Sequence, residues 1–258
     1  MIKELYTAAM GMIPQQTRLE VIANNMANSN TSGFKRDNVF ERNIIDAKAN
    51  LWNTPGDAEN DDPPMGKYID FRNGSFQETG NSLDLVVQDN GFFNLQDEEG
   101  KEFLSRNGHF KLSTDGKIIA KDGKMLMGID GPISVGQQFN SENTKEDNKV
   151  MDIKINDQGE VFANSQHVGS LLISKVENPQ QMEKVSGECF VARENAGVTY
   201  SSNENVSVKQ GWLEGSNVDI IKEMVDMIEL QRMFEAGSKV IHTNDSTLDN
   251  SIKLGKYY

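Results

Sequence analysis

The stretch SNVDIIKEMVDMIELQRMFEAGSKVIHTNDSTLDNSIKLG, residues 216–255, decides the architecture that the sequence predicts. Its repeating positions alternate in spacings of three and four residues and form one heptad frame: Ile220, Met224, Met227, Gln231, Phe234, Ser238, Ile241, Asp245, Leu248 and Ile252. Ser216 is expected to be the N-cap, and Gly255 is typical of a helix end. The stretch therefore predicts a helix over 217–254, on the order of 55 Å long, which favours a coiled coil.

The first 30 residues carry a second, shorter helical pattern. Its heptad positions are Ile2, Leu5, Ala9, Met12, Leu19, Ala23 and Met26. Pro14 removes a backbone donor and crowds the preceding turn, which predicts either a kink or a helix that begins only after it. The run from Asn28 to Gly33 then ends the helix, because Gly33 can take the left-handed conformation.

Pairing these two seams within one chain would leave a second apolar stripe uncovered, formed by Ile13, Ile22, Ile221, Val225 and Ile228. Helices with apolar surface beyond one seam need further neighbours, so we expect subunits to assemble through both helices. The residues expected at the assembly contacts are Ile2, Leu5, Ala9, Met12, Leu19, Ile22, Met26, Ile220, Met224, Met227, Ile228, Phe234, Ile241, Leu248 and Ile252. The polar members of the frame either mark the end of the seam or set the register of a multi-helix assembly.

Between the helices the sequence changes character twice. Residues 34–73 form a connecting segment whose acidic, proline-rich middle, 53–64, predicts a mobile loop. A calcium site is disfavoured there, because the carboxylates lack the alternate spacing and turn glycine of an EF-hand. Residues 74–211 consist of short apolar runs separated by glycine turns. The predicted fold class is therefore α+β, with an all-β central domain over 74–211 and long terminal helices, in 1–33 and 212–258, forming a discontinuous, coiled-coil-like assembly domain.

The glycine turns of the central region predict individual strands. Asn-Gly and Asp-Gly between apolar runs are the strongest short hairpin signals, because a type I′ turn needs positive φ at both central residues. Such pairs occur at residues 90–91, 107–108, 115–116 and 122–123. Strands are expected over 83–87, 92–95, 109–112, 117–120, 151–155, 160–163 and 171–176.

The bulk composition excludes several classes of function. A formal net charge of -13, with no cluster of Lys and Arg, argues against binding to nucleic acid. Cys189 is the only cysteine and the three histidines are scattered, so we expect no disulfide, metal or cofactor. No apolar window of about 18 residues predicts a membrane span, and the N-terminus lacks a cleavable signal peptide. No nucleophile elbow or HExxH motif occurs, so we expect neither catalytic residues nor enzyme activity.

Motifs at both ends and in the middle resemble one known family. Residues 22–35, IANNMANSNTSGFK, resemble the N-terminal signature of the flagellar axial proteins, the rod and hook family. Residues 74–85, GSFQETGNSLDL, together with GFF at 91–93 and SRNGHF at 105–110, resemble the β region of its rod members. Residues 213–218, LEGSNV, followed by Met224-Val225 and Phe234-Glu235, resemble its C-terminal signature. The residues taken as the family signature are Asn24, Asn25, Asn28, Asn30, Thr31, Gly33 and Phe34.

The resemblance implies a structural subunit that stacks helically into the rod, the drive shaft that crosses the periplasm. Its partners would be copies of itself, other rod proteins and the flagellar type III export apparatus, with no small-molecule substrate. Residues 127–133, MGIDGPI, and the chain length resemble the proximal rod member, with the distal rod protein as the alternative. A further alternative is a secreted binding module whose helices only oligomerise it, with Phe92, Phe93, Phe103 and Phe110 on an exposed β face.

Overall fold

The computed structural model describes residues 2–41, 65–135, 152–185, 188–193, 195–201 and 207–255. The chain forms two compact units. The helical unit comprises Met1–Ser29, Arg36–Asp70 and Val218–Tyr258, and the β unit comprises Asn30–Lys35 and Phe71–Asn217. The chain therefore passes between the units four times. The division at residues 33, 73 and 211 drawn from composition stays a prediction.

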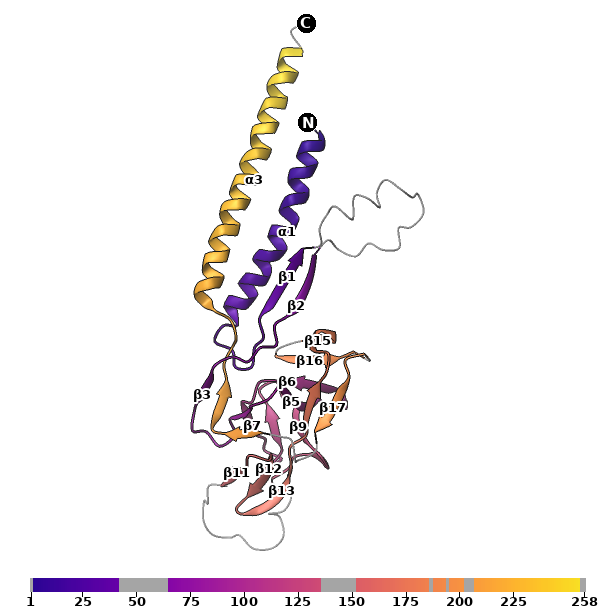
Figure 1. The fold of residues 1–258 in the computed structure, drawn as a ribbon, viewed down its shortest axis with the longest axis vertical. Coiled ribbons are helices and arrows are strands. Elements are labelled where there is room, and N and C mark those ends of the chain that lie inside the picture. Colours follow the sequence, from indigo (N-terminus) through magenta and orange to yellow (C-terminus); the bar gives the residue numbers. More distant parts are fainter. Residues whose placement is uncertain are drawn as a thin grey trace. The chain divides into compact units, whose positions relative to one another are not determined.

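The helical unit consists of two antiparallel helices and one hairpin (Figure 1). Helix α1 (Ile2–Ala27) and helix α3 (Ile220–Gly255) lie side by side, and strand β1 (Asp37–Glu41) packs on α1 and pairs with β2 (Met65–Ile69). Helix α1 contains Pro14, so the expectation of a helix that begins only after this residue was wrong.

Helix α3 begins three residues later than the sequence pattern predicts. The carboxylate of Asp219 accepts hydrogen bonds from the main-chain nitrogens of Ile221, at 3.0 Å, and Lys222, at 3.3 Å. These are two of the donors that a helix start leaves without an intrahelical partner. Asp219 is therefore the N-cap, and the assignment of that role to Ser216 was wrong.

The β unit is built on one large antiparallel sheet. Its strands follow the order β15 (Met182–Lys184), β16 (Cys189–Ala192), β6 (Glu102–Ser105), β5 (Gly91–Gln96), β9 (Met125–Gly128), β8 (Ile118–Ala120) and β7 (Phe110–Leu112). Strand β10 (Gly131–Pro132) pairs with β9, and β14 (Ile173–Val176) pairs with both β5 and β17 (Val198–Ser201). A short 3-10 helix, η2 (Pro179–Gln181), precedes β15.

Three smaller sheets complete the β unit. One contains β11 (Ile153–Ile155), β12 (Glu160–Ala163) and β13 (Gln166–Ser170). In the other two, strands from the C-terminal end of the unit pair with strands from its beginning. These are β18 (Val208–Gln210) with β4 (Leu85–Val87), and β19 (Trp212–Glu214) with β3 (Phe76–Glu78). The β unit is thus closed by its own last two strands.

The core of the β unit lies on strand β5 and its neighbours. Phe92, Phe93, Phe103 and Phe110 are all buried, the last two with 6% and 1% of their surface exposed. Edge-to-face packing of Phe93 on Phe110, with ring centroids 5.2 Å apart, ties β5 to β7. These rings cannot form an exposed recognition face, so the binding-module alternative was wrong about them.

Strands form at all seven predicted places, but only two of the four predicted turns make hairpins. Gly116 and Gly123 have φ of 74° and 86°, and their turns connect the paired strands β7–β8 and β8–β9. Gly91 and Gly108 instead allow close packing. A Cβ on Gly108 would lie 1.7 Å from the oxygen of Leu85, because strand β4 passes there on its way to pair with β18 rather than with β5.

The predicted fold class was wrong. The described residues form nineteen strands and only two α-helices, the N-terminal one being the shorter, so the protein is mostly β. The helices do not form the predicted coiled coil. A coiled-coil seam buries its heptad positions in holes of the partner helix, whereas Ile220, Met224 and Phe234 are 37%, 46% and 39% exposed.

Candidate assembly site and a buried ionic clasp

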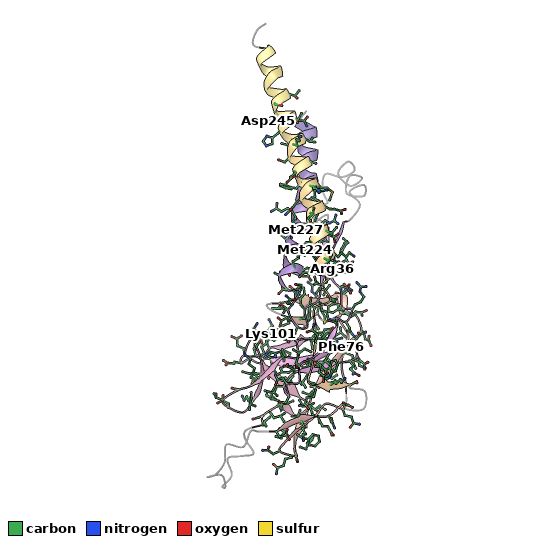
Figure 2. All side chains as sticks on the ribbon, turned by 90° about the vertical axis from the view of Figure 1, so that its left-hand side faces the viewer. Arg36, Phe76, Lys101, Met224, Met227 and Asp245 are labelled. Carbon is green, nitrogen blue, oxygen red and sulfur yellow. The ribbon has the colours of Figure 1, made fainter. Side chains whose placement is uncertain are left out.

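Helix α3 has apolar side chains on two opposite faces. On one face Leu230 is buried, together with Glu223, where α3 packs on α1. Leu230 follows Ile221 by nine positions, about two and a half turns, so the two residues lie on opposite sides of the helix. We call the outward face formed by Ile221, Met224, Val225 and Ile228 the open stripe. Its members are 72%, 46%, 53% and 51% exposed, and Figure 2 labels Met224 near the start of α3.

The positions that face α1 are displaced by one residue from the predicted frame. Glu223 and Leu230 are buried where the frame placed Met224 and Gln231. Of the other predicted assembly residues, Leu19, Met26, Met227 and Ile241 are half-buried and Ile22 is buried. Those whose side chains lie outside the described part are Ile2, Leu5, Ala9, Met12, Leu248 and Ile252. Their role in assembly stays a prediction.

Polar contacts fix the end of α1 against strand β1. The buried amide of Asn25 donates to the main-chain oxygen of Asp37 at 2.9 Å and accepts from its main-chain nitrogen at 3.0 Å. This side chain therefore makes both hydrogen bonds that a neighbouring strand would make. Arg36 forms an ion pair with the buried Glu223, whose second oxygen is buried without a partner among the described residues. The contact joins the residue before β1 to the first turn of α3.

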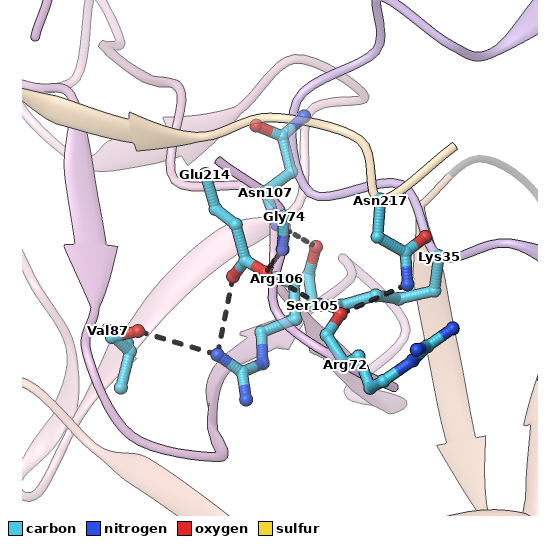
Figure 3. A network of polar contacts seen from close by, with 9 residues as sticks. All are labelled: Lys35, Arg72, Gly74, Val87, Ser105, Arg106, Asn107, Glu214 and Asn217. Atoms are coloured by element: carbon cyan, nitrogen blue, oxygen red, sulfur yellow. Dashed lines mark hydrogen bonds and ion pairs between the residues drawn. The ribbon is translucent and has the colours of Figure 1, made fainter. Parts of the chain in front are cut away.

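The β unit contains a cluster of buried charges that we call the clasp, formed by Lys35, Arg106 and Glu214 (Figure 3). Lys35 Nζ donates to Glu214 Oε1 at 2.6 Å, and Arg106 Nη1 donates to Glu214 Oε2 at 3.4 Å. The three side chains are 1–2% exposed. A single buried carboxylate thus balances two buried cations, so each charge depends strongly on the others.

The clasp also gathers main-chain groups from separate stretches of sequence. Glu214 Oε1 accepts from the nitrogen of Gly74 at 3.0 Å, and the main-chain oxygen of Glu214 accepts from Gly33 at 2.7 Å. The main-chain oxygen of Arg72 accepts from Lys35 Nζ at 2.8 Å and from Asn217 Nδ2 at 3.0 Å. Lys35, Phe71 and Asn217 border three of the four passages of the chain between the units. The clasp therefore anchors three chain crossings within the β unit.

Arg106 is the less completely paired member of the clasp. Its Nη1 also contacts the oxygen of Val87 at 3.4 Å, and its guanidinium lies 4.8 Å from the centroid of the Phe92 ring. Its Nε is buried without a hydrogen-bond partner among the described residues. Burial lowers the pKa of Arg106, and the charges of Glu214 and Asp89 only partly offset this effect. Removal of the Glu214 charge would therefore leave Arg106 in an unfavourable environment.

Gly33 lets the N-terminal signature reach the clasp. Its φ of 72° is a conformation that L side chains rarely adopt, and a Cβ there would lie 2.4 Å from the main-chain nitrogen of Asn107. The next residue, Phe34, is buried beneath Lys184, whose Nζ lies 3.7 Å from the ring centroid. Gly33 is thus required for close approach to the Arg106–Asn107 main chain as well as for its backbone conformation.

The signature residues chosen from sequence lie in two places. Asn24, Asn25 and Asn28 are at the end of α1, where Asn28 Nδ2 donates to the oxygen of Asn24 at 2.9 Å. Asn30, Thr31, Gly33 and Phe34 belong to the β unit. Sequence reasoning missed four buried charged residues, which are Lys35, Arg106 and Glu214 of the clasp, and Glu223. The first three lie inside the quoted motifs, and this was the available signal. A charged residue within a motif is, however, more often exposed than buried.

The described residues contain no group of three or more His, Cys, Asp or Glu side chains that could hold a metal ion. None of the helices in the described ranges is long and apolar enough to cross a membrane. Cys189 is buried, and its burial, with the nearby carboxylate of Asp122, raises the pKa of the thiol to about 12.

Three family models match this chain in order along the sequence. They are described as flagella basal body rod protein, over residues 5–35, flagellar hook protein FlgE/F/G D1 domain, over 86–163, and flagellar basal body rod FlgEFG protein C-terminal, over 209–254. The first model covers most of α1 and the residues up to Lys35, and the third contains β19 with Glu214 and most of α3. The second model covers Arg106, so the matches include all three members of the clasp.

Full-length relatives agree with these models. The flagellar basal-body rod protein FlgG of Agrobacterium fabrum is 32% identical, with 95% of this chain and 96% of the relative aligned. FlgG of Borreliella burgdorferi is 31% identical, with 96% and 97% aligned. FlgF of Buchnera aphidicola subsp. Schizaphis graminum is 28% identical, with 98% of each chain aligned.

The β unit with its buried clasp, the helix pair and these full-length matches define a structural protein of the bacterial flagellum. Among the described side chains, those of the clasp tie separate segments of the chain together. The chain belongs to the flagellar basal-body rod protein family. It is a structural subunit of the rod.

Proposed function

We propose that this rod subunit polymerises helically through its terminal helices, with the open stripe of α3 as one of the subunit contacts. The observation that carries the proposal is the open stripe itself, four large apolar residues on one helix face that the rest of the described chain leaves exposed. Isolated exposed apolar residues are common on protein surfaces, but a contiguous group at helical spacing favours a contact with another chain.

The size of the open stripe suits a polymer better than an isolated dimer. Fully burying one such side chain contributes about 1.5–3 kcal/mol, and these residues have roughly half of that still to gain. Four residues then contribute on the order of 4 kcal/mol, which association costs of about 4–15 kcal/mol would consume. A subunit in a helical assembly meets several neighbours at once, so contacts that are weak singly add up.

The test is Ile228→Asp, which places a charge in the middle of the open stripe. The expected result is loss of incorporation into purified basal bodies and loss of motility in cells that carry only this copy. Ile228→Leu is the matched control, because it keeps an apolar side chain of the same volume, and circular dichroism checks that both variants fold. Normal incorporation of the Ile228→Asp subunit would show that the open stripe is not a subunit contact.

The clasp has a role in this assembly as well. A rod turns as a drive shaft, so each subunit in it carries force. Hydrogen bonds of Lys35 Nζ, the Arg72 main-chain oxygen and Asn217 Nδ2 hold three chain crossings in the β unit, and the one from Lys35 to Glu214 is buried. Buried ionic contacts resist separation, since pulling one partner away leaves an uncompensated charge. The clasp would thus keep the β unit intact while the crossings carry load.

The place of the subunit in the rod belongs to the same proposal. Proximal type is favoured by the resemblance of residues 127–133 and by the chain length, and the relatives include proteins named FlgG and FlgF. The subunit would leave the cytoplasm through the flagellar type III apparatus and lie in the part of the rod that crosses the periplasm. Cysteine cross-linking of neighbours in isolated basal bodies distinguishes the proximal from the distal position. Retention of the protein in the cytoplasm of export-deficient cells tests the route.

A further inference from the structure

Methionine supplies a chemically reactive group within the open stripe. Met224 is 46% exposed and lies between Ile221 and Ile228 in the sequence of α3, and Figure 2 labels it on that helix. We propose that Met224 is an oxidation site, and that its conversion to methionine sulfoxide by a peroxide prevents a free subunit from assembling. This inference rests on the proposed function, because it takes the open stripe to be a subunit contact.

The chemistry needs only a peroxide, for example hydrogen peroxide. The thioether sulfur attacks one peroxide oxygen, an S–O bond forms and the O–O bond breaks. The sulfur is oxidised by two electrons, and the other peroxide oxygen leaves as hydroxide. The hydroxyl bound to sulfur gives its proton to that hydroxide, so the products are the sulfoxide and one water. The product carries a strongly polar oxygen where the stripe had an apolar side chain. Methionine sulfoxide reductases reverse the change, so the subunit could be restored.

Exposure separates Met224 from most of the other methionines whose side chains are described. Met182 is 6% exposed and lies in the β unit, and Met227 is half-buried. Met233 is the informative comparison, because it is 44% exposed on the same helix. It follows Met224 by nine positions, about two and a half turns, and therefore lies on the opposite side of α3. The two residues should oxidise at similar rates but differ in their effect on assembly.

The physical basis is the cost of burying an unpaired polar group. In the assembled state Met224 would lie against apolar side chains such as Ile221 and Ile228 of the open stripe and those of the neighbouring subunit. The sulfoxide oxygen would lose its hydrogen bonds with water there and find no donor. Assembly itself would also protect Met224, since a covered sulfur is inaccessible to peroxide. The site therefore responds to oxidation of the free subunit and not of the finished rod.

The experiment compares purified full-length wild type, Met224→Leu and Met233→Leu before and after treatment with hydrogen peroxide. Peptide mass spectrometry locates each sulfoxide, and sedimentation velocity over a range of concentrations measures self-association. We expect self-association of treated wild type and treated Met233→Leu to weaken by about tenfold or more, while treated Met224→Leu keeps its untreated affinity. Leucine preserves volume and apolar character at either position.

Two outcomes would overturn the inference. One is absence of sulfoxide at Met224 under conditions that oxidise Met233. The other is a loss of association in treated Met224→Leu as large as in treated wild type. Failure of the proposed function is recognised separately, because untreated Ile228→Asp would then self-associate as wild type does. If untreated Ile228→Asp self-associates less than wild type and treated Met224→Leu loses association as wild type does, the open stripe is a subunit contact, but oxidation of Met224 is not what prevents assembly.

Discussion

Replacing Glu214 with Gln tests whether the clasp stabilises the β unit. The substitution keeps the shape of the side chain and an oxygen that can still accept from Gly74, but it removes the negative charge. Lys35 and Arg106 would then be two buried cations with no opposing charge in the clasp. Because both side chains are buried, water cannot solvate either cation unless the β unit opens.

The expected cost follows from the burial of the pair. Removing one partner of a buried ion pair destabilises proteins by roughly 3–5 kcal/mol. Domains are stable by only about 5–15 kcal/mol, so this loss is a large part of the total. For a unit of this size, a loss of that magnitude corresponds to a decrease in Tm of roughly 6–20 °C.

Thermal and urea unfolding, followed by circular dichroism in the β-sheet region, measure this effect. Glu183→Gln is the matched control, because Glu183 pairs with Arg193 at 3.3 Å with both side chains more than half exposed. Such an exposed pair contributes about 0–1 kcal/mol. Adding Lys35→Met to Glu214→Gln should recover part of the loss, since it removes one of the two buried cations that had paired with Glu214. Equal Tm values for Glu214→Gln and Glu183→Gln would refute the argument.

Three further predictions concern single residues. Gly33→Ala should destabilise the β unit well beyond Gly100→Ala: both glycines have positive φ, which costs about 1–2 kcal/mol for alanine, but only Gly33 has main-chain atoms where the Cβ would lie. Equal shifts in Tm would contradict this. Asn25→Leu should cost about 1–3 kcal/mol and speed hydrogen exchange at the Asp37 amide. Asn24→Leu, at an exposed position next to it, should do neither. Cys189 should resist alkylation by iodoacetamide at about pH 8 until the protein is unfolded in urea, because burial raises the pKa of its thiol to about 12. Rapid labelling of the folded protein would be inconsistent with the structure. Since the thiol pKa in the folded state lies above that in the unfolded state, the contribution of the protonated thiol to folding stability is present below about pH 8.5 and is lost as the pH rises towards the folded-state pKa.

The sequence predicted the strands of the β unit well, because period-2 patterns and glycine turns are local signals. It predicted pairing less well. Asn90-Gly91 and Asn107-Gly108 look like hairpin turns, yet β4 pairs with β18, more than 100 residues away along the chain. A turn dipeptide records the conformation that is possible locally, while the partner of a strand depends on which distant segment covers its apolar face. Val208, from β18, is 1% exposed and lies in the same core as Leu85.

For the helices, the sequence predicted the elements but not their packing. The heptad pattern shows that the helices exist, but it does not show which face of α3 packs on α1. The pattern contains Met224 as a regular member, and the neighbouring positions, Glu223 and Leu230, form an equally regular series. Hydrophobicity favours the first series at this point, since Glu223 is charged. The structure selects the second because Arg36 neutralises the buried Glu223 carboxylate, and that partner is 187 positions away.

The clasp makes the folding of the β unit dependent on almost the whole chain. Lys35 and Glu214 are separated by 179 positions, so no local pattern could have indicated their contact. Strands β18 and β19 close the unit at the same end of the sequence. A chain that ends before Val208 would leave strand β4, which is buried along its whole length, without its partner. Because contacts this distant form only after a long loop has closed, the β unit reaches its stable state when the segment leading into α3 is in place. The segment that leads into the candidate assembly helix therefore also completes the β unit, which links the order of folding to the readiness of α3 for assembly.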